Sequence, residues 1–233
     1  MAFQDRHVVV TGGIGALGTA VVGALLDVGA TCHVPYRSPA EADRFPHRTS
    51  SHVKLIEAGD LADENAVAKI FDAVPRLWAS IHLAGGFAFG ALTEASVDII
   101  RQQIDTNLMT CLLCCRAAVA AMARSGEGGR IVNVAARPAL EWRQGKSMVA
   151  YTAAKAGLAA ATAALAEEVA GQGILVNAVA PSIMDTPANR ASMPKADYAA
   201  WPKVEEVAAT ILFLASPDNK VTRGAVVPVY GRS

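Results

Sequence analysis

The stretch Thr11-Gly-Gly-Ile-Gly-Ala-Leu-Gly18 decides the fold of this chain of 233 residues. It follows an apolar, strand-like run at His7–Thr11 and leads into a helical pattern. Within it, Gly12, Gly15 and Gly18 allow a tight turn, a close approach to a pyrophosphate, and close packing of the helix on the sheet. The N-terminus of that helix adds unpaired N–H donors and a dipole that favours an anion. Strand, turn and helix in this order predict a dinucleotide-binding site; the other interpretation is a tight turn without a ligand.

Outward from this turn, apolar strand-like runs alternate with helical ones along the whole chain. We expect strands at His7–Thr11, Thr31–Tyr36, Val53–Glu57, Ser80–Ala84, Arg130–Val134, Ile174–Val179 and Ala225–Val229. We expect helices at Leu17–Val28, Glu64–Ala73, Val97–Ala123, Tyr151–Ala170 and Val204–Leu214. Several strand runs are apolar throughout, which is typical of parallel strands covered on both faces. The alternation predicts an α/β fold: one Rossmann domain over residues 1–233, with a doubly wound, seven-stranded parallel sheet and helices on both faces.

The composition limits the partners of this domain. Lysine and arginine together number 21, as do aspartate and glutamate, so the formal net charge is zero. This balance argues against nucleic acid or an anionic membrane as the partner and favours a small molecule. The N-terminal segment shows no signal-peptide pattern, and no stretch approaches the roughly 18 uninterrupted apolar residues of a membrane span. We therefore expect a cytoplasmic protein.

The four cysteines, Cys32, Cys111, Cys114 and Cys115, are not expected to bind a metal. Cys111 and Cys114 have the spacing of half a metal site, but no second pair of ligands accompanies them. The sequence around them predicts an apolar helix, in which small buried thiols are common. We expect no metal site and a reducing environment.

The end of the second strand bears on the choice between NAD and NADP. An acidic residue there hydrogen-bonds the ribose hydroxyls of NAD, whereas an arginine accommodates the 2′-phosphate of NADP. Here the sequence is Val34-Pro-Tyr-Arg-Ser38, without an acid. Arg37 can pair with the phosphate and Ser38 can assist, so we expect NADPH; the alternative is a solvated surface arginine. Asp60, followed by Leu61, comes after the third strand and suits either a contact to the adenine or a turn.

Tyr151 and Lys155 form the candidate catalytic pair. They lie four residues apart in a predicted helix, so both side chains share one face. A phenol has an unperturbed pKa of about 10, and a neighbouring ammonium lowers that pKa towards the range useful for acid–base catalysis. The same lysine can hold the ribose of the nicotinamide. The alternative is an amphipathic helix that happens to begin with a tyrosine.

Together these motifs resemble the short-chain dehydrogenase/reductase family over nearly the whole chain. The matching features are the turn at Thr11–Gly18, Asp60, Ala84-Gly85, Asn107, the Tyr151/Lys155 pair, and Pro181 with Thr186. The resemblance implies that Tyr151 is the general acid/base, that Lys155 tunes it, and that Asn107 supports the lysine. The full set of expected cofactor contacts is Thr11, Gly12, Gly15, Ala16, Leu17, Gly18, Arg37, Ser38, Asp60, Leu61, Ala84, Gly85, Tyr151, Lys155, Pro181, Ile183 and Thr186.

Two departures from the family pattern lie near the expected cofactor. Ala16 stands where the family has a glycine of the turn, with Gly15 supplied one residue earlier. His82-Leu83 replaces a pair of asparagines after the fourth strand. We expect His82 to be a packed strand-end residue rather than a catalytic base.

A third departure concerns the family's catalytic serine, which follows the fifth strand. Residues 126–146 contain no serine or threonine, and Ala136 precedes Arg137 there. The lost hydroxyl is a donor worth a few kcal/mol in a transition state, and a substrate that delocalises charge over its own ring tolerates this loss best. Ser147, four residues before Tyr151, is either a substitute or an ordinary loop residue.

The dihydropteridine-reductase-like members of the family also dispense with this serine, and the chain resembles them in several stretches. The most specific runs from Asp185-Thr-Pro-Ala-Asn-Arg190 through Ser192-Met-Pro-Lys-Ala-Asp197 to Trp201. This resemblance implies reduction of a quinonoid dihydropterin. The resemblance to those members, however, implies NADH as the cofactor, because they have an acidic residue after the second strand. This chain has Arg37 there.

The substrate side is expected around a loop or lid at residues 181–202, because this segment follows the carboxyl end of a strand. Candidate substrate contacts are Ala136, Arg137, Trp142, Ser147, Met148 and Met184. Arg137 and Arg143 either meet an anionic substrate or are solvated charges. The alanine-rich helices at 97–123 and 151–170 pair across a twofold axis in the family, which implies a homodimer or homotetramer; composition alone also allows a buried face within a monomer.

Two classes of function are therefore compared. The first is an NAD(P)H-dependent oxidoreductase that transfers hydride to a carbonyl or conjugated imine, with dihydropteridine reductase as the specific alternative. The second is a nucleotide-sensing protein that keeps the fold without turnover. Asn107, Tyr151 and Lys155 favour the enzyme, because a sensor does not need a tyrosine paired with a lysine.

Overall fold

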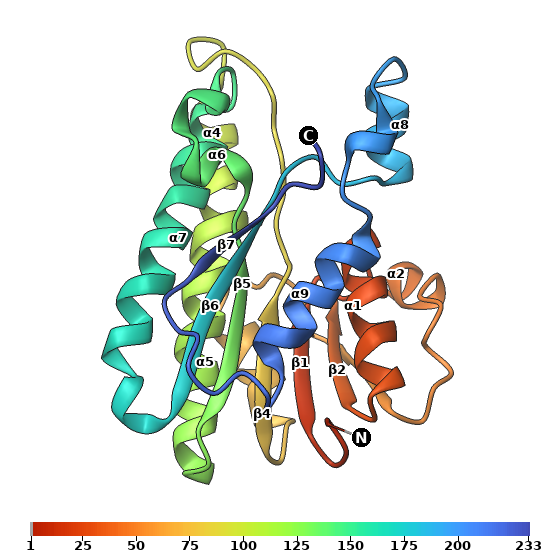
Figure 1. Ribbon diagram of the computed structural model, residues 1–233, viewed down its shortest axis with the longest axis vertical. Coiled ribbons are helices and arrows are strands. Elements are labelled where there is room, and N and C mark those ends of the chain that lie inside the picture. Colours follow the sequence, from red (N-terminus) through yellow and green to blue (C-terminus); the bar gives the residue numbers. More distant parts are fainter. Residues whose placement is uncertain (1) are drawn as a thin grey trace.

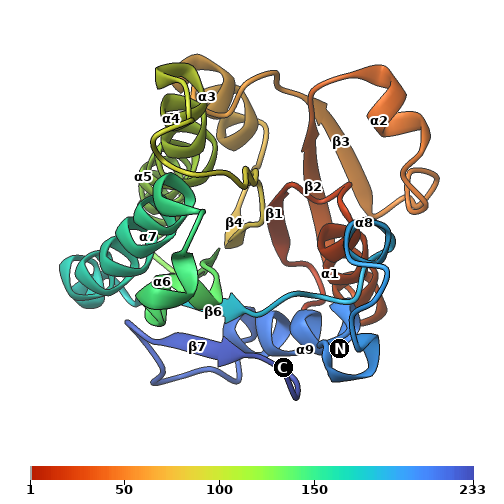
Figure 2. The ribbon, with the colours of Figure 1, turned by 90° about the horizontal axis from the view of Figure 1, so that it is seen from above.

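The computed structural model describes residues 2–233 and places a central sheet between two layers of helices (Figures 1 and 2). All neighbouring strands are parallel, in the order β3-β2-β1-β4-β5-β6-β7. The strands are β1 (His7–Thr11), β2 (Thr31–Tyr36), β3 (Val53–Glu57), β4 (Leu77–His82), β5 (Gly129–Val134), β6 (Ile174–Pro181) and β7 (Val226–Val229). The predicted α/β fold with a seven-stranded parallel sheet is confirmed.

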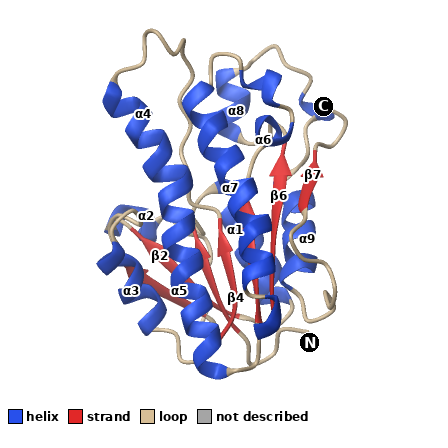
Figure 3. Ribbon diagram, turned by 90° about the vertical axis from the view of Figure 1, so that its left-hand side faces the viewer, coloured by secondary structure: helices blue, strands red, loops and turns tan. Residues whose placement is uncertain are grey.

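Helices cover both faces of this sheet, and Figure 3 shows one of them. That face carries α3 (Glu64–Asp72), α4 (Val97–Ile104), α5 (Thr110–Ser125) and α7 (Val149–Glu168). The opposite face carries α1 (Ala16–Asp27) and α9 (Val204–Ala215). The short helices that follow β2, β5 and β6 are α2 (Pro39–Asp43), α6 (Arg137–Leu140) and α8 (Pro187–Ser192).

The first strand shows how a continuous apolar run fills both cores. Val9 packs in the cluster beneath α3, α5 and α7, whereas Val8 and Val10 pack in the cluster beneath α1 and α9. All three side chains are fully buried. Successive side chains of a strand point to opposite faces, so a strand covered on both sides needs apolar residues throughout.

The strand order reverses between β1 and β4. The chain places β2 and β3 on one side of β1, and then crosses to build β4 to β7 on the other. At this point Thr11 lies beside His82 in the sheet. In doubly wound sheets, ligands bind in the crevice outside the carboxyl ends of the strands at such a switch point. The residues that follow β1 and β4 are therefore the first candidates for a binding site.

The fourth strand differs from the prediction Ser80–Ala84, because β4 begins at Leu77 and ends at His82. The backbone N–H of Leu83 donates to the carbonyl of Thr11 (3.0 Å), and the chain then leaves the sheet. Other predicted strands and helices lie within two residues of the observed bounds, except for the long helix after β4.

The predicted helix Val97–Ala123 contains an interruption that its apolar pattern does not reveal. A π-helical turn at Asp105–Met109 separates α4 from α5. Within it the side chain of Asn107 donates to the carbonyl of Gln103 (3.0 Å), an acceptor that an α-helix uses for its own backbone. The turn is widened at the residue that the sequence assigns to the site.

Two helical segments are apolar and long enough to cross a membrane by length and composition, namely Val97–Ser125 and Val149–Glu168, with mean hydropathies of 1.5 and 1.3. Both pack against the sheet, and each buries polar side chains that face the candidate site, Asn107 and Lys155. They are therefore helices that cover the sheet.

Candidate active site

A cleft of about 780 Å³ opens at the switch point. It is lined by Gly12, Ile14, Gly15, Pro35, Tyr36, Arg37, Glu41, Arg44, Gly59, Asp60, Leu61, Leu83, Ala84, Gly85, Asp98, Arg101, Gln102, Asp105, Thr106 and Thr110. Seven of the predicted cofactor contacts are among them: Gly12, Gly15, Arg37, Asp60, Leu61, Ala84 and Gly85. The cleft thus collects the ends of four neighbouring strands, β3, β2, β1 and β4, along one edge of the sheet.

The glycine turn has the geometry that its sequence predicts. Gly12 has φ +67°, and a side chain there would lie 2.7 Å from the backbone nitrogen of Ala84. A side chain at Gly18 would overlap the carbonyl oxygen of Gly12, so this glycine sets how closely α1 approaches the strand. Gly15 begins α1 at the mouth of the cleft, where its extra space is open to a ligand.

The other predicted residues of the turn do not line the cleft. Thr11 is buried and its hydroxyl oxygen accepts a long hydrogen bond from the backbone of Ala84 (3.5 Å). Ala16, Leu17 and Gly18 form the first turn of α1, and the side chain of Leu17 packs in the core. These residues shape the turn from behind.

The end of β2 brings two arginines and a glutamate to the cleft. Arg37 and Arg44 line it together with Glu41. Glu41 accepts a hydrogen bond from the backbone N–H of Arg37 (3.0 Å), and its carboxylate lies 3.7 Å from the Arg37 guanidinium. The Arg37 side chain is 74% exposed and open to a ligand. Ser38 precedes α2 as its N-cap residue and does not line the cleft.

Asp60 combines the two interpretations that its sequence allowed. One of its carboxylate oxygens accepts a hydrogen bond from the backbone N–H of Ala62 (2.9 Å), which shapes the turn after β3. The same residue lines the cleft beside Leu61. It is a turn aspartate placed within reach of a ligand.

Asn107 fastens the segment after β4 to the long helix. It is buried, donates to the carbonyl of Gly86 (2.9 Å), and accepts from the backbone N–H of Gly86 (3.1 Å). A side chain at Gly85 would lie 2.9 Å from the Asn107 Oδ1 and 3.5 Å from the Lys155 Nζ. Asn107 and Lys155 therefore converge on the backbone at Gly85.

Lys155 is buried and its ammonium is held by the end of β5. Its Nζ donates to the carbonyl of Val134 at 2.7 Å. Burial lowers the pKa of Lys155 to about 8, because the charged form loses its hydration. A lysine whose pKa lies this close to neutrality is typical of a functional site.

Tyr151 lies one helical turn before Lys155 but is not activated in the way that the sequence predicts. Burial raises the pKa of Tyr151 to about 12, and the Lys155 Nζ lies 6.0 Å from the centre of the Tyr151 ring. The expected lowering of this pKa is therefore wrong for this structure, because desolvation outweighs a distant ammonium that β5 already holds. Phe87 covers the phenol ring edge-on, with 5.1 Å between the ring centres.

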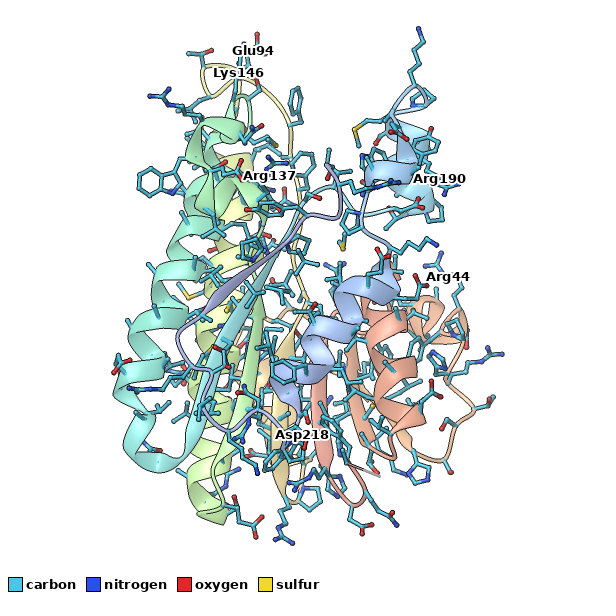
Figure 4. The ribbon with its side chains drawn as sticks, viewed as in Figure 1. Arg44, Glu94, Arg137, Lys146, Arg190 and Asp218 are labelled. Carbon is cyan, nitrogen blue, oxygen red and sulfur yellow. The ribbon has the colours of Figure 1, made fainter. Side chains whose placement is uncertain are left out.

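On the substrate side, Ala136 and Arg137 follow the end of β5, whose last residue, Val134, accepts the hydrogen bond from Lys155. Ala136 is buried. Arg137 donates to the Glu141 carboxylate (2.9 Å) and to the backbone carbonyl of Ser233 (2.9 Å). Its place above the sheet is visible in Figure 4.

The other predicted substrate contacts are dispersed. Trp142 is 74% exposed, and Met184 packs against the core beneath α9. Ser147 has a left-handed backbone with φ +60°, and its carbonyl accepts from Gly90 (2.9 Å). Met148 is the N-cap residue of α7. These four residues do not form one pocket with the cleft described above.

The three cofactor contacts predicted after β6 also lie outside the lining of the cleft. Pro181 ends β6, and Ile183 is 44% exposed. The Thr186 hydroxyl oxygen caps α8 by accepting a hydrogen bond from the backbone N–H of Asn189 (3.2 Å). The predicted loop at residues 181–202 is thus partly helical.

Sequence reasoning missed the wall of the cleft that the long helix supplies. It consists of Asp98, Arg101, Gln102, Asp105, Thr106 and Thr110. No motif marks these residues. Their only signal in the sequence is that they lie on the same helix as Asn107, on a polar face that precedes the apolar run of that helix. Glu41 and Arg44 were missed in the same way, although they lie within seven residues of Arg37.

Comparisons with known proteins agree with this geometry. The family described as short chain dehydrogenase matches residues 6–197. The cis-4-hydroxycyclohexanecarboxylate dehydrogenase of Sinomonas cyclohexanicum is 33% identical over 99% of this chain and 97% of its own. The 2-dehydro-3-deoxy-L-rhamnonate dehydrogenase (NAD(+)) of a Sphingomonas species is 30% identical over 98% of this chain and 95% of its own.

A solved structure extends the likeness to three dimensions. The structure described as ElxO with NADP bound has a TM-score of 0.87 and 26% identity, and covers 97% of each chain. Three findings favour an enzyme over a nucleotide-sensing protein: identity of about a third over the full length, a family match over most of the chain, and the same fold. The chain belongs to the short-chain dehydrogenase/reductase family and is an NAD(P)-dependent oxidoreductase.

Proposed function

We propose that this enzyme transfers hydride between NADP(H) and the carbonyl or secondary alcohol of a small, carboxylate-bearing molecule, with Tyr151 as the general acid/base. The observation that carries the proposal is the convergence of Asn107 and Lys155 on Gly85, with Tyr151 one helical turn before Lys155 on α7. The nicotinamide supplies or accepts the hydride, and a protein group must supply or accept the accompanying proton. Tyr151 is the hydroxyl best placed for that proton.

Lys155 supports this role through its charge and its position. Its pKa of about 8 leaves the ammonium largely charged at neutral pH, where it stabilises a developing phenolate. Asn107 forms two hydrogen bonds with the backbone of Gly86, and these hold the segment next to Lys155 in a fixed position. A phenol with a pKa of about 12 needs this support during alcohol oxidation, because it must then be a phenolate that accepts the proton of the alcohol.

The preference for NADP rests on the charges at the end of β2. Arg37 and Arg44 bring two positive charges to the cleft, against the single negative charge of Glu41. A guanidinium that is 74% exposed can form a paired interaction with a 2′-phosphate. Glu41 opposes the phosphate and favours ribose hydroxyls, so the balance between these side chains sets the degree of preference.

Arg137 supports a carboxylate on the substrate. It follows the end of β5 that Lys155 holds, and its guanidinium donates to both the Glu141 carboxylate and the Ser233 carbonyl. The names of the two dehydrogenases compared above, a cyclohexanecarboxylate and a rhamnonate, are those of acids. A substrate carboxylate would replace the Ser233 carbonyl on the guanidinium, which gains a charge-assisted pair.

The segment 181–202 is proposed to cover the substrate. Its ends are tied to the chain's last residues, because Ser182 donates to the Tyr230 carbonyl (2.9 Å) and Arg232 donates to the Ala199 carbonyl (2.9 Å). Figure 1 shows α8 rising above the carboxyl edge of the sheet. The segment therefore stands over the edge at which Arg137 and the cleft open.

A second candidate substrate is a quinonoid dihydropterin, and one observation favours it. Ala136 is buried after β5, where the family places a serine, so no hydroxyl from this segment can polarise a carbonyl. A conjugated imine that spreads charge over its own ring depends less on that donor. The two substrate classes differ in whether they carry a carboxylate for Arg137.

Steady-state rates with three acceptors test these proposals. We expect NADPH oxidation with 4-oxocyclohexanecarboxylate, a loss of roughly 100-fold or more in kcat for Tyr151→Phe, and unchanged NADPH binding. Cyclohexanone lacks the carboxylate, and Arg137→Ala is expected to reduce kcat/KM for the keto acid alone. Arg143→Ala is the matched control in the neighbouring turn. Turnover of quinonoid dihydropterin without turnover of the keto acid would replace the first substrate class by the second.

A further inference from the structure

A polar cluster lies in the core on the face covered by α5. It consists of His82 at the end of β4, Cys111 and Cys115 on α5, and Asn133 on β5. Their exposed fractions are 4%, 5%, 4% and 1%. The cluster forms no part of the cofactor cleft, and the proposed hydride transfer does not use it.

The ligand atoms of this cluster have the spacing of a metal site. The Cys111 and Cys115 sulfurs lie 4.0 Å apart across one helical turn, and the Cys115 sulfur lies 3.6 Å from the His82 Nδ1. All three atoms lie within 4.8 Å of one another. Tetrahedral zinc, with bonds of about 2.3 Å to sulfur and about 2.0 Å to nitrogen, requires edges of about 3.8 Å and about 3.6 Å.

A chain of hydrogen bonds turns a fourth donor towards the cluster. Thr162 donates its hydroxyl to the Leu158 carbonyl (2.8 Å), so its oxygen accepts from the Asn133 Nδ2 (2.9 Å). This fixes the Asn133 Oδ1 on the opposite side, 3.5 Å from the Cys115 sulfur and 2.8 Å from the His82 Nδ1. The amide oxygen thus lies beside two of the three ligand atoms, the Cys115 sulfur and the His82 Nδ1.

The second nitrogen of His82 has the partner that a metal-binding histidine requires. Its Nε2 lies 2.7 Å from the Ser80 hydroxyl. When Nδ1 binds a cation, the imidazole carries its proton on Nε2, which then donates to the Ser80 oxygen. Metal-bound histidines are generally oriented by such a contact.

We propose that His82, Cys111 and Cys115 form a binding site for a thiophilic divalent cation with a filled d shell, Zn²⁺ or Cd²⁺, with the Asn133 Oδ1 as fourth donor. On binding, each thiol releases one proton to solvent and the histidine stays neutral. The two thiolates balance the charge of the cation, so the filled site carries no net charge into the core. Thiolate and imidazole donors select against Mg²⁺ and Ca²⁺, which require oxygen ligands.

This set of residues differs from the pair that the spacing suggested. The sequence matched Cys111 with Cys114 and found no partners for them, whereas the helix places Cys115 one turn from Cys111 on the same face. The histidine comes from β4, far away in the sequence. Cys114 has no sulfur contact with this cluster among the described residues and serves as the internal control.

Titration of the metal-free, full-length protein with Cd²⁺ tests the site. Thiolate-to-cadmium charge transfer absorbs in the ultraviolet and reports sulfur ligation only. Binding to His7 and His33, whose ring nitrogens lie 2.9 Å apart, therefore does not contribute to the signal. We expect about one equivalent to bind and to raise the Tm. Zn²⁺ should displace the absorption signal, and Mg²⁺ should not.

Matched variants identify the ligands. Cys115→Ala is expected to weaken Cd²⁺ binding at least 100-fold, and Cys114→Ala to leave it unchanged. His82→Asn, which keeps a polar side chain in place of the imidazole, should weaken binding at least tenfold and covers the case that Cys115→Ala does not fold. No charge-transfer signal in the wild-type protein, or equal loss in Cys114→Ala and Cys115→Ala, would overturn the proposal.

Discussion

The buried ammonium of Lys155 is the costliest single group of the site. Its Nζ has one hydrogen-bond partner among the described residues, the Val134 carbonyl, and no carboxylate beside it. Burial lowers the pKa of Lys155 from 10.5 to about 8. Below pH 8 the buried ammonium therefore lowers the free energy of unfolding of the protein. The buried charge lies one helical turn from Tyr151, the proposed general acid/base.

The cost of the Lys155 charge predicts a pH-dependent stability. Between pH 8 and pH 10.5 the unfolded chain holds a proton that the folded chain has lost, so the Lys155 contribution to the free energy of unfolding rises with pH. Below pH 8 both states are protonated and this contribution is constant. We expect the wild-type free energy of unfolding, minus that of Lys155→Met, to increase by about 2 kcal/mol from pH 8 to pH 10.

Urea unfolding at several pH values measures this difference. Subtracting Lys155→Met removes the shared contributions of the thiols and tyrosines that also titrate in this range. Lys146 is an exposed lysine, labelled in Figure 4, and its replacement by Met is the control. A difference for Lys155→Met that stays flat, or falls as the pH rises, would contradict the burial argument.

Arg37 and Glu41 predict opposite changes in cofactor affinity. Arg37→Ala removes a charge-assisted pair with the 2′-phosphate and should raise the Kd for NADPH by roughly 10–100-fold. Glu41→Gln removes the repulsive carboxylate, 3.7 Å from the guanidinium, and should tighten NADPH binding severalfold. Cofactor fluorescence titrations measure both, with NADH as the comparison. Equal losses for the two cofactors in Arg37→Ala would leave the arginine without a role in selectivity.

At the scale of residues, the sequence predicts which side chains form the candidate site better than it predicts their pKa values. The positions of Asn107 and Lys155 follow from spacing, and both converge at Gly85. The pKa of Tyr151 does not follow from spacing, because it depends on how deeply the ring is buried and on which partner holds the lysine. Those two facts come from β5 and Phe87, which lie elsewhere in the chain.

At the scale of elements, the turn between β1 and α1 separates packing from ligand binding. A methyl group at Gly18 would overlap the Gly12 carbonyl, and moving α1 away costs about 1–3 kcal/mol. A methyl group at Gly15 meets only that carbonyl, at 3.4 Å, and points into the space left for a ligand. Gly18 is therefore needed for the packing of α1, whereas Gly15 is expected to serve ligand binding.

The pair Gly18→Ala and Gly15→Ala tests this division. Gly18→Ala should lower the free energy of unfolding by about 1–3 kcal/mol. Gly15→Ala should keep the stability and raise the Kd for NADPH roughly tenfold, the loss of about one backbone hydrogen bond. Urea unfolding and cofactor titration of both variants are the measurements. Equal destabilisation by the two substitutions would show that Gly15 also serves packing.

Element boundaries follow from sequence only where the chain stays in regular structure. The first three strands match their predicted bounds because apolar runs end at glycine or polar turns. The fourth strand begins three residues before its predicted start and ends two residues before its predicted end, and a π-helical turn at Asp105–Met109 interrupts the predicted long helix. Hydropathy cannot show these points, since the deviations depend on contacts between Leu83 and Thr11 and on the side chain of Asn107.

At the scale of the whole molecule, the helices that build the site also leave apolar surface exposed. In the most apolar 18-residue stretch of each of the two long segments, only 44% and 33% of the residues are buried. Met109 and Leu112 are 39% and 41% exposed on the first of them, and Val149 is 47% exposed on the second. Exposed apolar side chains on neighbouring helices are typical of a surface that pairs with another subunit.

We predict that the chain is a homodimer or homotetramer that associates through these two helical segments, 97–125 and 149–168. In a twofold interface each substitution occurs twice, so Leu112→Glu buries two carboxylates against apolar surface and should weaken association roughly 100-fold or more. Val221, 84% exposed in the loop before β7, is the control, and Val221→Glu should leave the oligomer intact. Light scattering coupled to size-exclusion chromatography measures the mass. A monomeric wild-type protein would contradict the prediction, and dissociation by Val221→Glu would move the interface to the opposite side.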